Sequence, residues 1–300
     1  MIVVSVMGGL GNQMFQYAFG RALAQRLGRR LVLDLSLMPT GRPPFLRPYE
    51  LESFSLPDAV ARIGGVRSAQ AATERSRPFE LGLRIARRAM RGLVVTEPEE
   101  DRVLEAEEVP RGLAVLVGYW QSHLYFADIA TTIRAELTPP LSASLPEVHA
   151  LARAERGDVI AVHVRRGDYV AQPDAATFHG VQEASYYERG VSSILEGSDS
   201  RATVLVFSDD PEWAEKVLRF DAPTIHVERE RPLSALDSLA LMSRCTHHVL
   251  SHSSFSWWGA WLAEHPAQQV IYPSRWFTSR PIRPGFRFPS HWTGIGSTVT

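Results

Sequence analysis

A short run of the sequence places four hydrogen-bonding side chains at the end of an apolar strand. The run VIAVHV at 159–164 carries His163, and Arg165, Arg166 and Asp168 follow it. Strand alternation places His163 and Arg165 on one face and Arg166 on the other. A planar guanidinium can form two hydrogen bonds with phosphate oxygens and neutralise charge on a leaving pyrophosphate. The alternative is an ion pair between either arginine and Asp168 at a solvated edge, and this motif alone favours that alternative.

A second motif, FSDDPEWA at 207–214, ends a strand and begins a helix. Ser208 or Asp209 is suited to cap the helix N-terminus, with Pro211 in the first turn. Capping explains one acid, and the other can accept two N–H bonds from the edge of a guanine ring. The pair does not predict a metal site, because neighbouring acids point apart on most backbones and no third ligand lies nearby in the sequence.

Three serines precede an aromatic helix in HHVLSHSSFSWWGAWL, at 247–262. Ser251, Ser253 and Ser254 offer hydroxyl groups, and the N–H of Phe255 lies at the start of the helix. Hydroxyls and unpaired N–H groups at a helix start form an anion site. A plain N-cap at Ser253 or Ser254 is the alternative, and it explains one serine but not three.

A glycine turn, GGLGNQ at 8–13, follows the first strand and opens a helix. Glycines such as Gly11 let a ligand approach the backbone closely, and the helix start attracts a phosphate or carboxylate. No lysine follows, so the motif is not a P-loop, and it lacks the last glycine of a dinucleotide fingerprint. A plain tight turn explains it about as well. The amides of Asn12 and Gln13 serve either as helix caps or as donors to a ligand.

The elements that must position these motifs alternate between strands and helices. Residues 1–34 read as strand, glycine turn, helix and strand, with Gly28 ending the helix. A second series follows the Pro- and Ser-rich segment 138–146, with strands expected at 158–164, 202–208, 224–228, 247–251 and 268–273 and helices at 184–197, 210–220, 234–245 and 254–265. Such alternation predicts parallel sheets of the doubly wound α/β class. We therefore expect two Rossmann-like domains, 1–140 and 141–300, with ligands beyond the carboxyl ends of the strands.

Composition and charge exclude several classes of function. The formal net charge is -1, so the chain lacks the charge expected of a general nucleic-acid binder. Cys245 is the only cysteine, so no disulfide can form within one chain, and we expect it to be a buried apolar residue. No secretory signal pattern opens the sequence, and no apolar run reaches membrane-spanning length. We therefore expect a cytoplasmic protein.

Five blocks of the sequence together resemble the bacterial α-1,2-fucosyltransferases of glycosyltransferase family 11. In order they are GGLGNQMFQYAFGRALA, GYWQSHLYF, HVRRGDY, FSDDPEWA and LMSRCTHHVLSHSSFSWWGAWL, and the resemblance runs from Met1 to about Trp276. It implies the GT-B fold, in which two Rossmann-like domains face each other across a cleft. It also implies inverting transfer of L-fucose from GDP-fucose to the 2-hydroxyl of a terminal galactose, in an oligosaccharide or glycolipid. Neither a metal nor a cofactor is implied beyond the GDP-fucose donor.

The resemblance assigns most donor contacts to the second domain. Arg165 would bind the β-phosphate and stabilise GDP as it leaves, and His163 would contact the nucleoside. Asp209 would accept hydrogen bonds from guanine. The pyrophosphate would be held by Ser253, Ser254 and the N–H of Phe255.

Further roles are implied near the glycine turn and after the strand that ends at 164. Asn12, in the turn with Gly11, would face the donor from the first domain and belong to the catalytic set. Arg166 and Asp168 would fix the loop after the strand, or Asp168 would act directly in catalysis.

The acceptor side is expected in the first domain, at the block GYWQSHLYF. Tyr119 and Trp120 can stack on sugar faces, with Gln121 beside them, and core packing of both aromatics is an equal alternative. A general base would help the attacking hydroxyl. The candidates, which the sequence does not rank, are Asp168, His123 and Glu183.

Other interpretations stay open. One is a different fucosyltransferase linkage such as α-1,6, and another is a non-catalytic protein that binds a GDP-sugar or a glycan. The segment 84–91 also places Arg84, Arg87, Arg88 and Arg91 on one helical face. Such a stripe is usually solvated surface, and its alternative is peripheral contact with anionic lipid at the inner face of the membrane.

Overall fold

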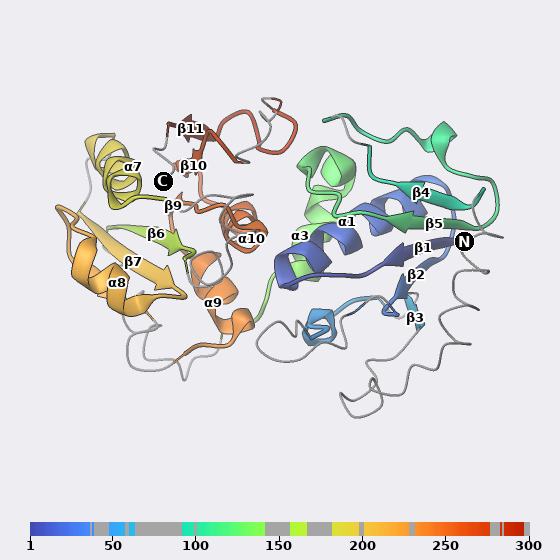
Figure 1. The fold of residues 1–300 in the computed structure, drawn as a ribbon, viewed down its shortest axis with the longest axis horizontal. Helices are drawn as coiled ribbons and strands as arrows, with labels where there is room; N and C mark the ends of the chain where they lie inside the picture. Colours follow the sequence, from blue (N-terminus) through green and yellow to red (C-terminus); the bar gives the residue numbers. More distant parts are fainter. Residues whose placement is uncertain are drawn as a thin grey trace. The chain divides into compact units, whose positions relative to one another are not determined.

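The chain divides into two compact units, Met1–Leu137 and Thr138–Thr300. This division falls at the start of the Pro- and Ser-rich segment where the sequence predicts a boundary. Each unit contains one parallel sheet with its helices (Figure 1). The computed structural model describes residues 1–36, 38, 48–57, 60–63, 92–98, 101–141, 157–166, 182–197, 201–227, 232–276, 283 and 285–296.

The first unit is built around a five-stranded parallel sheet in the order β3-β2-β1-β5-β4. Its strands are β1 (Ile2–Ser5), β2 (Leu31–Asp34), β3 (Ala61–Ile63), β4 (Val94–Thr96) and β5 (Ala114–Val117). Its described helices are α1 (Leu10–Arg26), η1 (Leu51–Ser53), η3 (Ala106–Glu108), η4 (His123–Ile129) and α3 (Ala130–Leu137). Helix α1 joins β1 to β2, so the strand, turn, helix and strand expected over residues 1–34 are confirmed.

Helix α1 is buried along nearly its whole length, by β1 and β2 of the sheet and by η4. Gly20 allows the close approach, because a Cβ there would lie 2.5 Å from Cγ2 of Val4 and 2.9 Å from Cδ1 of Leu31. The helix ends at Arg26, and Gly28 follows with a φ of +60°, a left-handed conformation that glycine adopts without strain. Gly28 thus lies just beyond the helix end, as the sequence predicts.

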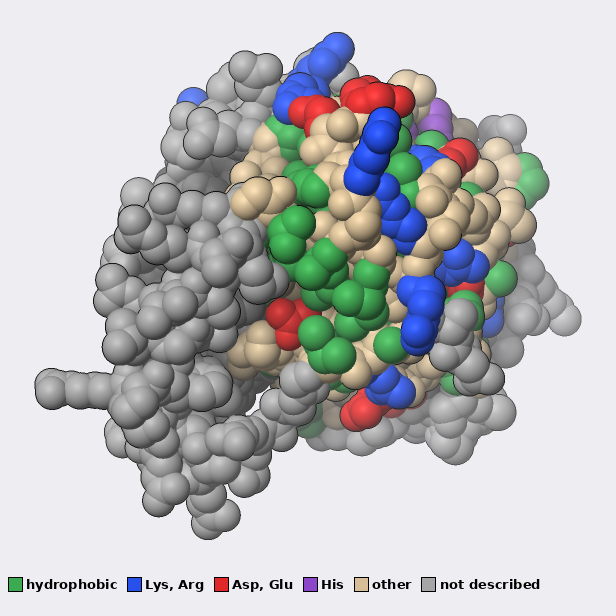
Figure 2. All heavy atoms as spheres, turned by 90° about the vertical axis from the view of Figure 1, so that its right-hand side faces the viewer, with side chains coloured by type: hydrophobic (Ala, Val, Ile, Leu, Met, Phe, Trp, Pro, Cys, Tyr) green, Lys and Arg blue, Asp and Glu red, His purple; other side chains and the backbone are tan. Residues whose placement is uncertain are grey.

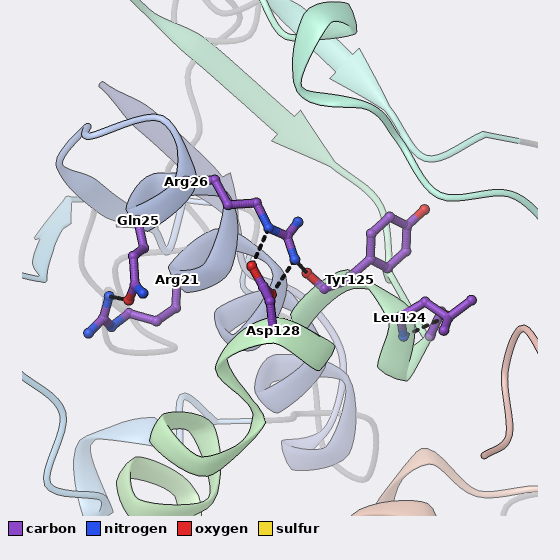
Figure 3. Close-up of polar contacts among 7 residues, drawn as sticks. Arg21, Gln25, Arg26, Leu124, Tyr125 and Asp128 are labelled. Carbon is purple, nitrogen blue, oxygen red and sulfur yellow. Dashed lines mark hydrogen bonds and ion pairs between the residues drawn. The ribbon is translucent and has the colours of Figure 1, made fainter.

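Ion pairs and hydrogen bonds fasten α1 to the segment that follows β5. Figure 3 shows Arg26 reaching Asp128: its Nε donates to Oδ2 at 2.7 Å, and its Nη2 donates to Oδ1 and to the carbonyl oxygen of Tyr125. The guanidinium holds the pKa of the Asp128 carboxyl below its usual range. The Tyr17 hydroxyl also donates to Oε2 of Glu136 in α3, at 2.6 Å. These contacts fix the chain that leaves β5.

The first sheet is apolar on the face opposite α1 as well. Val3, Val32 and Val115 lie side by side in register, with Ala61 and Val94 partly buried against them. Side chains alternate between the faces of a strand, so this cluster lies opposite Val4, which contacts the helix.

On the face of the molecule in Figure 2, hydrophobic side chains gather in the middle and basic side chains border them on one side.

The second unit has the strand order of a doubly wound sheet. Its strands are β6 (Asp158–Val164), β7 (Ala202–Ser208), β8 (Thr224–His226), β9 (His247–Val249), β10 (Val270–Pro273) and β11 (Thr293–Ile295). They are parallel, in the order β11-β10-β9-β6-β7-β8. The chain starts in the middle at β6, adds β7 and β8 on one side, and returns to add the other three, which is the Rossmann order. Strands β6 to β10 were expected from the sequence, whereas β11 is an additional strand.

Helices cover both faces of the second sheet (Figure 1). On one face, α7 (Ala184–Glu196) and α8 (Pro211–Val217) pack on the even-numbered apolar residues of β6. On the other, α9 (Ala235–Met242) and α10 (Ser254–Leu262) pack on its odd-numbered residues, and Cys245 is buried there as expected. Helix α8 ends before the expected position 220, because the backbone becomes extended at Leu218. The predicted fold class, two Rossmann-like α/β domains, is confirmed.

Candidate active site

Three of the predicted motifs lie at one edge of the second sheet. Strands β9, β6 and β7 are neighbours, with Val162 opposite Val249 and Val164 opposite Ser208. Because the strands are parallel, the loops that follow them leave from the same edge. The chain reverses its direction of sheet growth between β6 and β9, and ligands of open α/β sheets bind at such a switch point. The three motifs therefore meet at the edge where the sequence places them, and ligand binding at this edge stays a prediction.

Arg165 forms an ion pair with Asp209, the first residue after β7. Its Nη1 lies 3.1 Å from Oδ2 of Asp209, and the side chains are 27% and 23% exposed. The other carboxylate oxygen accepts from the backbone N–H of Arg166 at 2.7 Å. The sequence offered Asp168 as the partner of the arginines, and Asp168 lies outside the described residues. Within the described residues, the carboxylate after the neighbouring strand pairs with Arg165, and pairing of either arginine with Asp168 stays a prediction.

Asp210 caps helix α8, where the sequence predicted Ser208 or Asp209. The Asp210 side chain accepts from the N–H of Trp213, at 3.2 Å. Ser208 is still paired in the sheet, opposite Val164, and its hydroxyl accepts from the N–H of Asp210 at 3.0 Å. The expectation was wrong because β7 extends through Ser208. This shift assigns the cap to Asp210 and leaves Asp209 for the arginines.

Arg166 follows the end of β6 and contacts α8, on the face of the sheet that the alternation predicts. Its guanidinium carbon lies 3.9 Å from the centroid of the Trp213 ring, and its Nε is 3.8 Å from Oδ2 of Asp210. A guanidinium over an indole face is attracted by the negative face of the ring. Arg166 therefore fastens the loop after β6 to the first turn of α8. Sequence reasoning missed Trp213, although an aromatic in the first turn of a helix beside two arginines was a usable signal.

His163 is buried at the end of β6 and is 8% exposed. Its Nδ1 lies 2.7 Å from the hydroxyl oxygen of Ser251, and its ring centroid lies 5.9 Å from that of Phe255. Burial, and secondly the nearby charge of Arg165, lowers the pKa of His163 to about 3. The imidazole is therefore neutral near pH 7, and it links the end of β6 to the loop after β9 by a hydrogen bond.

The serines before α10 have different partners. Ser253 is the N-cap and accepts from the N–H of Phe255 at 3.3 Å, which is the capping alternative raised by the sequence. Ser251 is paired with His163, whereas Ser254 is the first helical residue and is partly exposed. Ser251 and Ser253 thus both have structural contacts. Pyrophosphate binding by Ser253, Ser254 and the N–H of Phe255 stays a prediction.

In the first unit, the glycine turn and the segment after β5 are joined by side-chain amides. Gln121 donates from Nε2 to Oδ1 of Asn12 at 2.7 Å, and Asn12 is partly exposed. Gln13, by contrast, is fully buried and donates to the carbonyl oxygens of Gly8 and Pro48. Gln13 therefore braces the turn, while the donor-binding roles of Gly11 and Asn12 stay predictions.

The two aromatics predicted to stack on the acceptor are placed differently. Trp120 is 0% exposed and its ring stacks on Phe19 at a centroid distance of 4.3 Å. The core-packing alternative therefore holds for Trp120, since neighbouring rings cover the face that a sugar would need. Tyr119 is 46% exposed and can reach a ligand. Of the base candidates, His123 lies in η4 and Glu183 at the N-cap of α7, and neither position identifies a base.

The described part of the chain bears on the metal and membrane expectations. In it, no group of three or more His, Cys, Asp or Glu residues is arranged to hold a metal ion. None of the helices described is long and apolar enough to cross a bilayer. The arginine stripe at 84–91 lies outside the described residues. Metal independence and peripheral membrane contact therefore stay predictions.

Comparison with known proteins identifies the family. Three relatives match over most of this chain. The O-antigen biosynthesis glycosyltransferase WbnK of Escherichia coli is 31% identical, over 90% of this chain and 93% of the relative. An alpha-1,2-colitosyltransferase of Escherichia coli is 28% identical over 98% of both chains, and the galactoside alpha-(1,2)-fucosyltransferase 1 of Leontocebus fuscicollis is 25% identical over 98% of this chain and 74% of its own. Residues 108–295 match the family model described as glycosyl transferase family 11. The chain therefore belongs to glycosyltransferase family 11, as its sequence blocks indicated.

Proposed function

We propose that this family 11 glycosyltransferase moves L-fucose from GDP-fucose to the 2-hydroxyl of a terminal galactose, with inversion at the anomeric carbon. One observation carries the proposal: a guanidinium, a carboxylate and a helix N-terminus with serines converge at the switch point of the second sheet. Arg165 and Asp209 form the pair at 3.1 Å, and Ser253 caps α10 on the other side of β6. A nucleoside diphosphate has a partner for each of these groups.

Arg165 is the group whose charge matters most in this reaction. As the glycosyl bond breaks, negative charge develops on the diphosphate, and a guanidinium already oriented there stabilises that charge without reorganising. Removing one such preorganised donor costs about 2.7–4 kcal/mol, or about 100- to 1000-fold in rate. Asp209 orients Arg165, and Arg166 fixes the loop on Trp213.

The acceptor hydroxyl attacks from the side of the anomeric carbon opposite the diphosphate. Its proton passes to a base or to solvent while the sugar has oxocarbenium character. His163 is a poor candidate for that base, because its neutral ring is buried and already hydrogen-bonded to Ser251. Single substitutions distinguish the three candidates for the base: Asp168→Asn, His123→Gln and Glu183→Gln. The variant that loses transfer identifies the base.

Fucose and colitose donors are distinguished by one hydroxyl. Colitose is fucose without its 3-hydroxyl, and one relative is named for each sugar. A site that hydrogen-bonds a substrate hydroxyl rejects the analogue without it strongly, because a buried polar group is left unpaired. GDP-fucose and GDP-colitose, offered separately and then in competition, therefore decide the donor.

The deciding experiment incubates the purified chain with each donor and a panel of β-galactosides, in the presence of EDTA. Product linkages are then determined by NMR. We expect fucose on the galactose 2-position. Transfer only from GDP-colitose, or only to a 6-hydroxyl, would refute the donor or the linkage. Loss of transfer in EDTA would refute metal independence, and GDP binding without transfer to any acceptor would indicate a binding protein.

Variants of Arg165 test the observation that carries the proposal. Arg165→Ala should lower kcat/KM for the donor by about 100- to 1000-fold, and Arg165→Lys should recover part of that loss. Arg201→Ala is a matched control, because Arg201 is exposed and precedes β7 at the opposite edge of the sheet. Equal activity of Arg165→Ala and Arg201→Ala would contradict the assignment.

A further inference from the structure

The loop after β5 lies at the switch point of the first sheet. Strand β5 pairs with β1, and the sheet continues through β2 and β3 on one side and β4 on the other. The glycine turn after β1 and residues 118–122 after β5 therefore leave from the same edge. The hydrogen bond between Gln121 and Asn12 joins the two loops. Ligands bind at this position in open α/β sheets.

Trp120, in this loop, has a backbone conformation that few L-residues adopt. Its φ is 55°, and no other non-glycine residue in the described ranges has a positive φ. The left-handed conformation is unfavourable for a bulky side chain. Its Nε1 is also buried, with no hydrogen-bond partner within the described structure. Strained residues persist where the surrounding structure holds them, and they cluster at functional sites.

Packing and hydrogen bonds hold the strained residue in place. The Trp120 ring stacks on Phe19 at 4.3 Å and meets the edge of Tyr125 at 5.7 Å. The backbone carbonyl of Trp120 accepts from the N–H of Ser122 at 2.8 Å. Helix α1 supplies Phe19, and Arg26 of the same helix holds the carbonyl of Tyr125 (Figure 3). Trp120 is therefore an anchor whose position is set by α1.

The backbone next to Trp120 leaves the side chain of Tyr119 exposed. The N–H of Tyr119 donates to Oε2 of Glu97 at 2.7 Å, and the preceding carbonyl, of Gly118, accepts from Gln16 at 3.0 Å. Gly118 is required there, because a Cβ would lie 2.6 Å from Cβ of Glu97. The backbone on both sides of Tyr119 is thus fixed, while 46% of its surface is exposed. The loop therefore holds an exposed aromatic residue on a fixed backbone.

An exposed phenol ring on a fixed backbone, in the loop whose Gln121 is hydrogen-bonded to Asn12, suits a pyranose. The axial 4-hydroxyl of galactose leaves the hydrogens of C3, C4 and C5 on one face, and that apolar face can lie on the negative face of an aromatic ring. We propose that Tyr119 is the platform on which the galactose ring of a β-galactoside acceptor stacks, with Trp120 as its anchor. The proposal deepens the proposed function, on which its catalytic readout rests.

Two variants of Tyr119 distinguish the contribution of the aromatic ring to acceptor binding from the contributions of the hydroxyl and of a merely apolar side chain. Tyr119→Leu keeps an apolar side chain without a π face, and we expect it to raise the KM for the galactoside by about tenfold, the effect of losing one aromatic contact. The KM for the donor should not change. Tyr119→Phe keeps the ring and should retain the wild-type values. Wild-type acceptor KM in Tyr119→Leu would overturn the proposal, as would equal losses in both variants.

A binding measurement without donor keeps this test independent of catalysis. Saturation-transfer NMR with methyl β-D-galactoside should give a signal with the wild type and Tyr119→Phe, and a weaker one with Tyr119→Leu. If galactoside binding depends on the ring but no fucose is transferred, the platform stands and the proposed function fails. If fucose is transferred but Tyr119→Leu behaves as wild type in both assays, the platform fails alone. No binding of a galactoside to the wild type would also overturn the platform.

Discussion

Substitution of His163 tests whether a neutral, buried imidazole links β6 to the loop after β9. An Asn side chain places an amide near the position of Nδ1, so His163→Asn keeps a partner for Ser251 and removes the titratable ring. In the folded protein, burial and secondly the charge of Arg165 lower the pKa of His163 to about 3. In the unfolded chain a histidine has a pKa near 6.5. Between about pH 6.5 and pH 3, His163 is therefore protonated in the unfolded chain and neutral in the folded chain.

The sign and size of the effect follow from proton linkage. Above about pH 6.5 neither state is protonated, so His163 imposes no penalty there. As the pH falls toward 3, the folded-state pKa, each unit below the unfolded value costs about 1.4 kcal/mol. Between pH 7 and pH 5 the wild type should therefore lose about 2 kcal/mol of stability through this one residue. His163→Asn should not lose that part.

Urea unfolding of both proteins at pH 7, 6 and 5 measures this difference. At pH 7 we expect His163→Asn to be the less stable, because the substitution removes ring packing against Phe255. That gap should close by about 2 kcal/mol at pH 5. Other groups, including the buried His248, whose pKa burial lowers to about 4, are present in both proteins and cancel. A gap that stays constant from pH 7 to pH 5 would refute the buried, neutral assignment.

Substitutions at three further positions test individual contacts. Asp209→Asn should lower kcat/KM for GDP-fucose by about tenfold, because a neutral amide orients Arg165 less strongly than a carboxylate; steady-state kinetics measures this, and an unchanged value would contradict it. Trp120→Gly should be about 0.5–1 kcal/mol more stable than Trp120→Ala in urea unfolding, since only glycine accepts the left-handed φ freely. Gly20→Val should lose about 1–3 kcal/mol of stability through overlap with Val4, and a thermal melt equal to the wild type would refute that packing.

Much of the second unit is predictable from the sequence, for a physical reason. Its strands are apolar runs bounded by caps and turns. When such strands alternate with helices, only a few parallel-sheet topologies are possible. The rule that ligands bind at the carboxyl ends of strands then selects Arg165, Asp209 and Ser253. Neighbouring strand ends are brought together by the ladder itself, so residues 44 positions apart in sequence, Arg165 and Asp209, meet without further information.

Local detail depends on contacts that the sequence pattern does not show. Whether Ser208 belongs to the strand or to the cap depends on pairing with Val164, a long-range contact. The positive φ of Trp120 is held by long-range contacts such as the stacking on Phe19, because an aromatic residue alone disfavours that conformation. The three-residue strand β11, which includes Gly294, is too short to show a period.

The pair of Arg165 and Asp209 reconciles two requirements of the proposed donor site. A guanidinium that is 27% exposed needs an anionic partner when no diphosphate is bound, yet it must turn to the diphosphate when one arrives. Asp209 meets the first need with Oδ2, and the N–H of Arg166 holds its other oxygen in place. Each carboxylate oxygen has two lone pairs. Asp209 can therefore stay fixed as Arg165 shifts, and still accept from a guanine edge, so the ion pair and the predicted base contact are compatible.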